Sequence, residues 1–143
     1  MSFRNLFSER LGKLRKERGM SYAELGKQLG VSDEAVRLME KAKRSPSFEI
    51  LCSIAELFAV PVDYLLGRGV FENWDKVLQH KELVCKTLSE QYPVIDQIGM
   101  DLMALSDSAL MQIIAALVRK IEFVEEEGQC KIKIFLYPMY LPD

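Results

Sequence analysis

The chain has 143 residues, of which 49% are hydrophobic and 28% are charged, and its formal net charge is −2. This composition is typical of a globular protein, and the absence of an apolar run of about 18 residues argues against a membrane span. The first residues lack the apolar core of a secretion signal, and the three cysteines form no Cys-x-x-Cys pair, so we expect a cytoplasmic protein with free thiols.

The charge divides unevenly along the chain. Residues 1–69 carry twelve Lys and Arg against nine Asp and Glu, whereas residues 70–143 carry seven against twelve. A polyanion is attracted to the first part and repelled by the second. We therefore predict two domains that meet near Gly67-Arg68-Gly69: residues 1–69 bind nucleic acid, and residues 70–143 form a helical dimerisation or interaction region.

The first domain shows apolar residues repeating every three or four positions, a spacing typical of helices that share one core. Gly19, Pro46, Pro61 and Gly67 mark the boundaries between these segments. The pattern predicts five helices, at about 3–18, 22–29, 33–41, 48–58 and 62–66.

Two of these helices are joined by a tight turn. Ser21 and Glu24 have the spacing of a capping box, which starts a helix at about residue 22. Gly30 can adopt the left-handed backbone that ends this helix, and Ser32 can cap the next one. The order of these signals predicts a helix-turn-helix, in which the second helix can enter a major groove of DNA.

Residues 7–67 resemble the Cro/phage-repressor (XRE) family of helix-turn-helix regulators. The resemblance depends on separate motifs that occur in order: Leu-Arg-Lys-Glu-Arg-Gly at 14–19, Leu-Gly-Val-Ser at 29–32, Glu40, Lys43-Arg44-x-Pro46 and Val-Asp-Tyr-Leu-Leu-Gly at 62–67. It implies an all-α, five-helix lambda-repressor-like DNA-binding domain. It further implies that the helix at 33–41 lies in the major groove and that two copies bind a two-fold double-stranded operator.

The resemblance also implies roles for single residues. Val36 and Met39 match inward-facing apolar positions, and the outward face that reads bases is then Asp33, Glu34, Arg37, Leu38 and Lys41. Arg15 and Glu40 match a pair that ties the first helix to the recognition helix, although an ordinary surface ion pair is the alternative. Residues that match phosphate contacts are Lys43 and Arg44, with the start of the helix at 22–29 and the turn adding Tyr22 and Ser32.

Two acidic residues depart from the family pattern at the start of the recognition helix. Asp33 and Glu34 stand where the family commonly has side chains that donate to base edges. A carboxylate can accept from cytosine N4 but is repelled by phosphate, so these acids either read bases or favour the positive end of their helix dipole. Arg37 is the best candidate for reading guanine, with a phosphate contact or a solvated charge as the alternative.

The second domain has no family pattern, and its apolar spacing is our only guide. The spacing predicts a helix at about 72–91 that Pro93 ends, followed by an apolar piece at about 94–104. A further helix carries apolar residues spaced four, three, four and three apart. We favour this seam as a homodimer interface, with packing within one chain as the alternative; its residues are Leu110, Ile114, Leu117, Ile121 and Val124.

The C-terminal segment at about 130–137 alternates apolar and charged residues, which predicts one short β-strand. Ile132 and Ile134 lie on its apolar face. The strand pairs either with residues 121–125 in a hairpin or with its counterpart in a second copy. We favour pairing between copies, because it removes an open edge and joins the subunits. An apolar tail, Tyr137 to Leu141, follows and should be covered.

Enzyme chemistry has little support in the sequence. His80, the only histidine, lies among polar residues, and no phosphate loop, metal-ligand cluster or nucleophile elbow occurs. We therefore expect no catalytic residue, no metal and no cofactor. The leading hypothesis is a dimeric, sequence-specific DNA-binding regulator, most simply a repressor. The alternative is an antitoxin or antirepressor-type module that uses the helix-turn-helix face to bind a protein.

Overall fold

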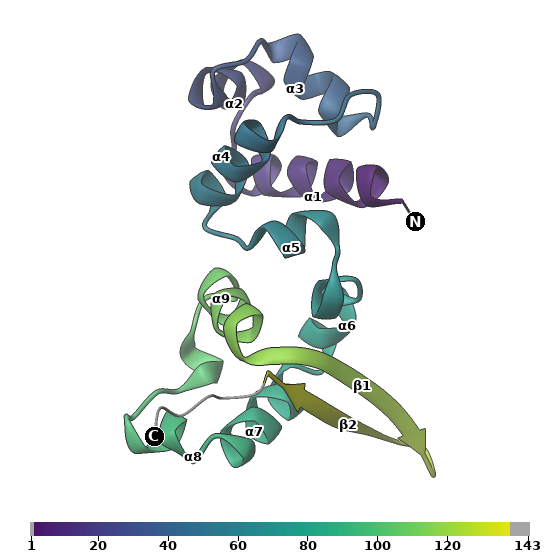
Figure 1. The fold of residues 1–143 in the computed structure, drawn as a ribbon, viewed down its shortest axis with the longest axis vertical. Coiled ribbons are helices and arrows are strands. Elements are labelled where there is room, and N and C mark those ends of the chain that lie inside the picture. The colour runs from purple at the N-terminus through teal and green to yellow at the C-terminus, as the bar shows by residue number, and fades with distance from the viewer. Residues whose placement is uncertain (1, 138–143) are drawn as a thin grey trace. The chain divides into compact units, whose positions relative to one another are not determined.

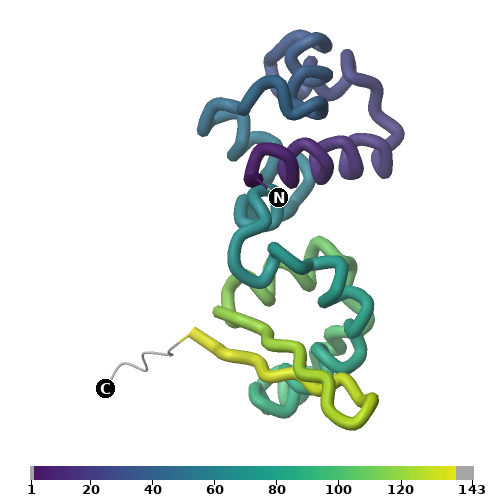
Figure 2. Tube along the Cα trace, turned by 90° about the vertical axis from the view of Figure 1, so that its right-hand side faces the viewer, coloured from purple at the N-terminus to yellow at the C-terminus, as the bar shows by residue number. Residues whose placement is uncertain are grey.

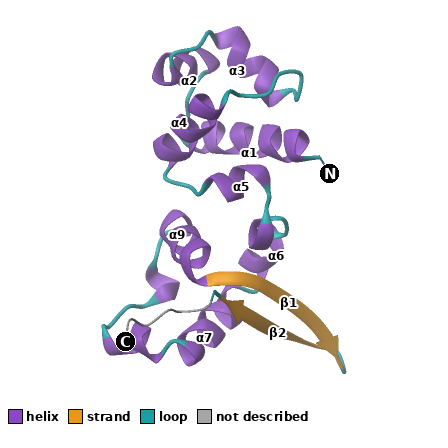
Figure 3. Ribbon diagram, viewed as in Figure 1, coloured by secondary structure: helices purple, strands orange, loops and turns teal. Residues whose placement is uncertain are grey.

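The computed structural model describes residues 2–137 and divides the chain into two units, Met1–Arg68 and Gly69–Asp143. The described residues are mostly helical and include one two-stranded antiparallel sheet in the second unit (Figure 3). Each unit has its own buried core. None of the helices within residues 2–137 has both the length and the apolar character needed to cross a membrane.

Unit 1 consists of α-helices whose ends agree with the sequence signals to within one residue. Ser2, Ser21, Ser32 and Ser47 cap four of them through side-chain hydrogen bonds to the backbone. The helices are α1 (Phe3–Glu17), α2 (Tyr22–Leu29), α3 (Asp33–Glu40), α4 (Phe48–Phe58) and α5 (Val62–Leu66).

The core of unit 1 lies where α1 meets the other helices. In Figure 1, α2 and α3 lie side by side at one end of the unit, with α1 and α4 next to them. Fully buried apolar side chains come from all five of these helices: Phe7, Leu11, Leu25, Val36, Ile54 and Leu65 are among them. Removing this much apolar surface from water supplies the main stabilisation of the unit, at about 1.5–3 kcal/mol for each large side chain.

Unit 2 begins with short helical elements and ends with a β-hairpin. The helical elements are the 3₁₀ turn η1 (Gly69–Phe71), α6 (Trp74–Gln79), α7 (Lys81–Gln91), α8 (Pro93–Gln97), the 3₁₀ turn η2 (Leu102–Ala104) and α9 (Asp107–Leu117). The hairpin strands are β1 (Val118–Glu126) and β2 (Gln129–Leu136). The strands pack against η1 and α7, which cover part of the sheet.

The prediction of one continuous helix over 72–91 was wrong. The helix is interrupted at His80, which ends α6 and precedes α7 with a non-helical backbone (φ −111°, ψ 28°). The His80 ring lies against Phe123 of β1, with ring centroids 5.5 Å apart, and its Nε2 lies 3.9 Å from Sγ of Cys130 on β2. The break therefore coincides with contacts to the hairpin, which the local sequence does not encode.

The predicted helical seam was also wrong beyond Leu117, where α9 ends and β1 begins. Leu110 and Ile114 lie on the helix but are buried in their own chain, with 1% and 0% of their surface exposed. Ile121 and Val124 lie on the strand. No helix therefore carries these five apolar residues together.

Residues 129–136 form the expected strand, but its partner is β1 of the same chain rather than a second copy. The register pairs Ile121 with Ile134 and Phe123 with Ile132 on one face of the sheet. Glu127 and Gly128 join the strands with positive φ angles of 51° and 75°, as in a type I′ hairpin turn. Figure 2 shows the sharp reversal of the chain at this turn. Residues 138–141 of the predicted apolar tail lie outside the described residues.

Candidate nucleic-acid interface

The predicted capping box and turn are confirmed. The backbone N–H of Glu24 donates to Oγ of Ser21 at 3.1 Å, and the N–H of Ser21 donates to Oε2 of Glu24 at 3.2 Å. Gly30 ends α2 in the left-handed conformation (φ 73°, ψ 29°), and Oγ of Ser32 accepts from the N–H of Ala35 at 3.1 Å. The turn between α2 and α3 is thus held by hydrogen bonds at both helix ends.

Gly26, which the sequence analysis did not single out, allows this turn to close. A Cβ atom at this position would lie 2.7 Å from the carbonyl oxygen of Val31, closer than such atoms approach in proteins. The backbone of the turn therefore packs directly against α2. A glycine inside a helical pattern is a recognisable signal of such an approach, because it otherwise lowers helix stability.

Helix α3 has a buried face and a solvent face. Val36 and Met39 are 0% and 2% exposed, which confirms their predicted place in the core. The predicted base-reading residues lie on the other face, where Asp33, Glu34 and Lys41 are exposed and Arg37 and Leu38 are half-buried. Lys41 follows the last residue of the helix as its cap.

Glu34 and Arg37 form an ion pair on this solvent face. Nε of Arg37 donates to Oε2 of Glu34 at 2.8 Å, and Nη2 of Arg37 donates to the other carboxylate oxygen. Hydrogen bonding by Arg37 lowers the pKa of Glu34, and the same bonds raise the pKa of Arg37. One of the two acids that depart from the family pattern is therefore already neutralised by its neighbour one turn along the helix.

Arg15 of α1 connects three parts of the helix-turn-helix. Its guanidinium donates twice to the carboxylate of Glu40, with Nε–Oε2 and Nη2–Oε1 distances of 2.6 and 3.0 Å. It also donates to the carbonyl oxygen of Met20 at 2.8 Å and lies 4.3 Å from the centre of the Tyr22 ring. The hydrogen bonds that Arg15 donates to Glu40 raise the pKa of Arg15 despite the opposing effect of burial. Both side chains are nearly buried, with 11% and 8% exposed.

Helix α1 holds α3 and the following loop at further points that the sequence did not reveal. The hydroxyl of Ser8 donates to the carbonyl oxygen of Met39, and Nε of Arg4 donates to Oγ of Ser45 at 3.0 Å. Gly12 faces Glu40 so closely that a Cβ atom there would lie 3.0 Å from Oε1 of the carboxylate. These contacts set the position of α3 relative to α1.

The loop after α3 presents the predicted phosphate-binding residues. Ala42 adopts a left-handed conformation (φ 58°), and the N–H of Lys43 returns to the carbonyl oxygen of Leu38 at 2.9 Å. The loop thus reverses directly after the recognition helix, and Lys43 and Arg44 are exposed. Ser32 is exposed at the other end of α3, and the Tyr22 side chain is 36% exposed at the start of α2.

In unit 1, two helices are joined by a tight turn, and the second helix is held by α1 and exposes a polar face to solvent. These features define the class of helix-turn-helix domains. The helix-turn-helix family model matches residues 11–65 of this chain. Two curated relatives have related sequences. An HTH-type transcriptional regulator from Archaeoglobus fulgidus is 33% identical over 67 residues, which make up 47% of this chain and 96% of that protein. The chain therefore belongs to the XRE-type helix-turn-helix family of transcriptional regulators.

The second relative, HTH-type transcriptional regulator YqaE of Bacillus subtilis, is 34% identical over 74 residues, or 52% of this chain. The chain spans 61% of the length of YqaE. Among solved structures, the P22 c2 repressor in complex with a synthetic operator is 33% identical, with a TM-score of 0.41, and covers 42% of this chain and 91% of its own. The clp gene regulator ClgR of Corynebacterium glutamicum is 19% identical, with a TM-score of 0.45, and covers 65% and 97%.

Proposed function

We propose that this protein is a sequence-specific DNA-binding transcriptional regulator that acts in the cytoplasm as a homodimeric repressor. The observation that carries the proposal is the division of α3 into a fully buried apolar face and an open polar face, in a chain of the helix-turn-helix family. Unit 1 would then be a lambda-repressor-like DNA-binding domain, and a double-stranded operator would be its partner.

In this proposal α3 enters the major groove and its solvent face contacts base edges. Arg37 donates to O6 and N7 of guanine, Asp33 accepts from cytosine N4, and Leu38 contacts a thymine methyl group. Lys43 and Arg44 bind phosphates on one side of α3, and Tyr22 and Ser32 do so on the other. Lys41 lies at the end of α3 and completes the reading face.

Glu34 gives this surface an unusual feature for a DNA reader. Its carboxylate holds one edge of the Arg37 guanidinium, Nε and Nη2, in the free protein, so DNA must either replace Glu34 as the partner of Arg37 or bind the pair as a unit. In the second case Arg37 reaches a base with its remaining N–H donors, on Nη1 and Nη2, while Glu34 accepts from a neighbouring cytosine. In either mode of binding, affinity for DNA depends on the identity of the base opposite this pair.

Dimerisation is proposed to use unit 2. Leu110, Ile114 and Ile134 are already buried within one chain and can contribute little surface to a partner. The half-buried members of the predicted set remain: Leu117, Ile121, Val124 and Ile132. A dimer would place two α3 helices about one helical turn of DNA apart, so the operator should have half-sites spaced by about 10 base pairs.

The experiment begins with selection of bound fragments from random duplexes, which yields an operator and its half-site spacing. Affinities are then measured by fluorescence anisotropy over a series of salt concentrations. Arg37→Ala should weaken binding to the operator about tenfold to a hundredfold while changing binding to random DNA much less. Replacing Lys43 and Arg44 with Ala should weaken both, and should lower the salt slope by about two.

Lys16→Ala is the matched control, because Lys16 is an exposed cation of α1 that the proposal does not place against DNA. Binding by Arg37→Ala and by the Lys43 and Arg44 double variant equal to that of the parent protein would exclude α3 as a DNA reader. The alternative of a protein-binding module would gain support if Asp33→Asn abolished a protein complex while none of the substitutions of basic residues affected DNA binding. The two acids at the start of α3 are the reason to test this protein-binding alternative.

A further inference from the structure

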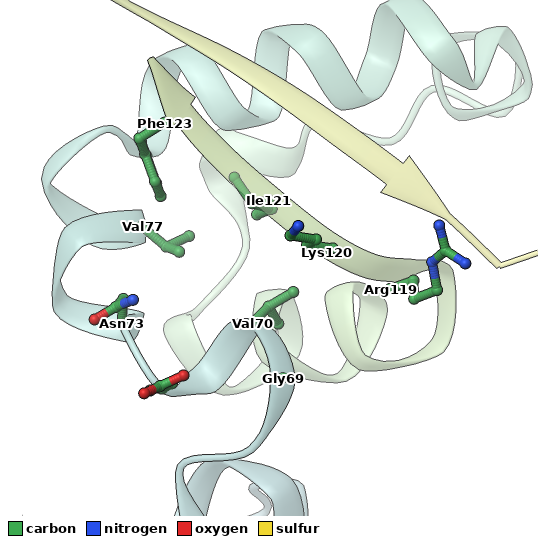
Figure 4. A pocket seen from close by; sticks show the side chains of 9 residues that line it. Gly69, Val70, Asn73, Val77, Arg119, Lys120, Ile121 and Phe123 are labelled. Atoms are coloured by element: carbon green, nitrogen blue, oxygen red, sulfur yellow. The ribbon is translucent and has the colours of Figure 1, made fainter. Parts of the chain in front are cut away.

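Unit 2 contains a hollow of about 480 Å³ that the DNA-binding proposal does not use. It lies between the segment from Gly69 to Val77 and the first residues of β1 (Figure 4). Its volume falls within the range of pockets that hold small organic ligands, about 300–1,000 Å³. All the residues that line it belong to unit 2.

One part of the lining is apolar. Figure 4 shows Val70, Val77, Ile121 and Phe123 around the same space, two from each of the segments that form the hollow. Val77 is 2% exposed and is held in the core, which makes this part of the wall firm. Phe123 is fixed from two sides, by the ring of His80 and by the ammonium group of Lys76, which lies 4.8 Å from the centre of its ring.

The other part of the lining is polar because β1 is irregular at its start. Val118 pairs with Leu136 and Lys120 pairs with Phe135, so Arg119 is an extra residue in β1, as in a β-bulge. In a regular strand, successive side chains point to opposite faces. Here three consecutive residues, Arg119, Lys120 and Ile121, line one hollow. Bulges often redirect side chains next to binding sites.

The charges of the lining favour an anion. The lining contains two cationic side chains, Arg119 and Lys120, and one carboxylate, that of Glu72. Lys120 has a partner, because its Nζ lies 2.6 Å from Oε1 of Glu122. The side chain of Arg119 makes no hydrogen bond or ion pair with any other residue in the 2–137 range, so its guanidinium is available to a ligand.

Asn73 adds a neutral polar group at the opposite end of the hollow from Arg119 (Figure 4). It precedes α6, yet its side chain makes no capping hydrogen bond, so the amide can donate to a ligand. The guanidinium of Arg119 at one end of an apolar wall matches a molecule with a carboxylate at one end and a short hydrocarbon tail at the other.

We propose that this hollow is a binding site for a small amphipathic organic anion, a carboxylate with a short apolar tail. Arg119 binds the carboxylate through paired N–H donors, and Lys120, the next residue of β1, adds a second positive charge to the lining. Val70, Val77 and Phe123 contact the tail. The site goes beyond DNA binding and does not depend on it, because every residue involved lies in unit 2.

Octanoate is a suitable probe, and isothermal titration calorimetry on the full chain measures its binding. We expect saturable binding with one octanoate per chain. Octan-1-ol, which has the tail without the charge, and acetate, which has the charge without the tail, should each bind at least tenfold more weakly. Trp74, the only tryptophan of the chain, packs on Phe71 with ring centroids 5.1 Å apart and follows Asn73, so its fluorescence offers a second readout.

Arg119→Gln should weaken octanoate binding about tenfold, since it removes a charge-assisted hydrogen-bonding partner. Lys133→Gln is the matched control: it removes one exposed cation from the same hairpin, away from the hollow, and should leave binding unchanged. Circular dichroism establishes that both variants are folded. Absence of octanoate binding by the parent protein, or equal affinity of the parent and Arg119→Gln, would overturn the proposal.

Discussion

Glu40→Gln is the most direct test of how α3 is held in place. The Arg15–Glu40 pair has two short hydrogen bonds, and its side chains are only 11% and 8% exposed, so water screens it little. Glutamine has one carbonyl oxygen where glutamate has two acceptor oxygens. Its amide NH₂ would therefore face a guanidinium donor, and one charge-assisted hydrogen bond would be lost outright.

The expected cost follows from these contacts. Loss of a hydrogen bond to a charged group costs about 1.5–3 kcal/mol, and leaving a buried charge without its partner costs about 3–5 kcal/mol. Arg15 keeps the carbonyl oxygen of Met20 and the ring of Tyr22 as neighbours, so we expect the cost of the substitution to lie toward the lower end of these values. We expect unit 1 to lose about 2–3 kcal/mol of unfolding free energy, which lowers the melting temperature of a unit this size by at least about 8 °C.

Urea unfolding followed by far-UV circular dichroism measures this loss in unit 1, and the helices of unit 2 contribute to the same signal. Trp74 lies in unit 2, so its fluorescence reports the other unit in the same sample. Glu34→Gln is the matched control: the same substitution in an exposed ion pair of the same helix should leave the unfolding midpoint unchanged. A loss below about 0.5 kcal/mol for Glu40→Gln, no greater than that of the control, would refute the reasoning.

Two further predictions concern the solvent face of α3 and the loop after it. Arg37→Gln should raise the pKa of Glu34 toward its ordinary value in a carboxyl NMR titration; because Arg37 lowers this pKa, the pair is intact at neutral pH and is lost as the pH falls through the lowered value. An unchanged titration would show that the two side chains do not interact in solution. Ala42→Gly should stabilise unit 1 by about 0.5–1 kcal/mol in urea unfolding, since a left-handed alanine is strained, whereas a destabilised variant would contradict a positive φ at this position.

The helix-turn-helix unit was predictable because its signals are local. Serine caps, the capping box of Ser21 and Glu24, and the left-handed Gly30 each act within four residues of a helix end. The apolar spacing of the helices agrees with these boundaries, so propensity, capping and core pattern all indicate the same structure. Agreement between independent local signals is what made the ends of α1 to α5 accurate to a residue.

The break at His80 and the end of α9 were not predictable in the same way. Residues 118–124 include Val, Ile, Phe and Val, which fit the spacing of a helix and also alternate as in a strand. What favours the strand is its partner: Ile132 and Ile134 lie opposite Phe123 and Ile121, and a turn with two positive φ angles brings them there. Strand formation depends on such distant pairs more than on local preference.

The candidate site shows the same division between local and distant information. The spacing of Glu34 and Arg37 is three residues, and opposite charges at this spacing on one helix face commonly pair, so the ion pair could have been inferred from the sequence. The contacts that Ser8 and Arg4 make with Met39 and Ser45 could not, because they join residues 31 and 41 positions apart. A recognition helix must be held precisely before it meets DNA, since a displaced side chain loses its hydrogen bonds to the base edge. The precision of α3 therefore depends on α1, a helix that the proposal places away from DNA, and substitutions there should alter recognition without removing a contact to DNA.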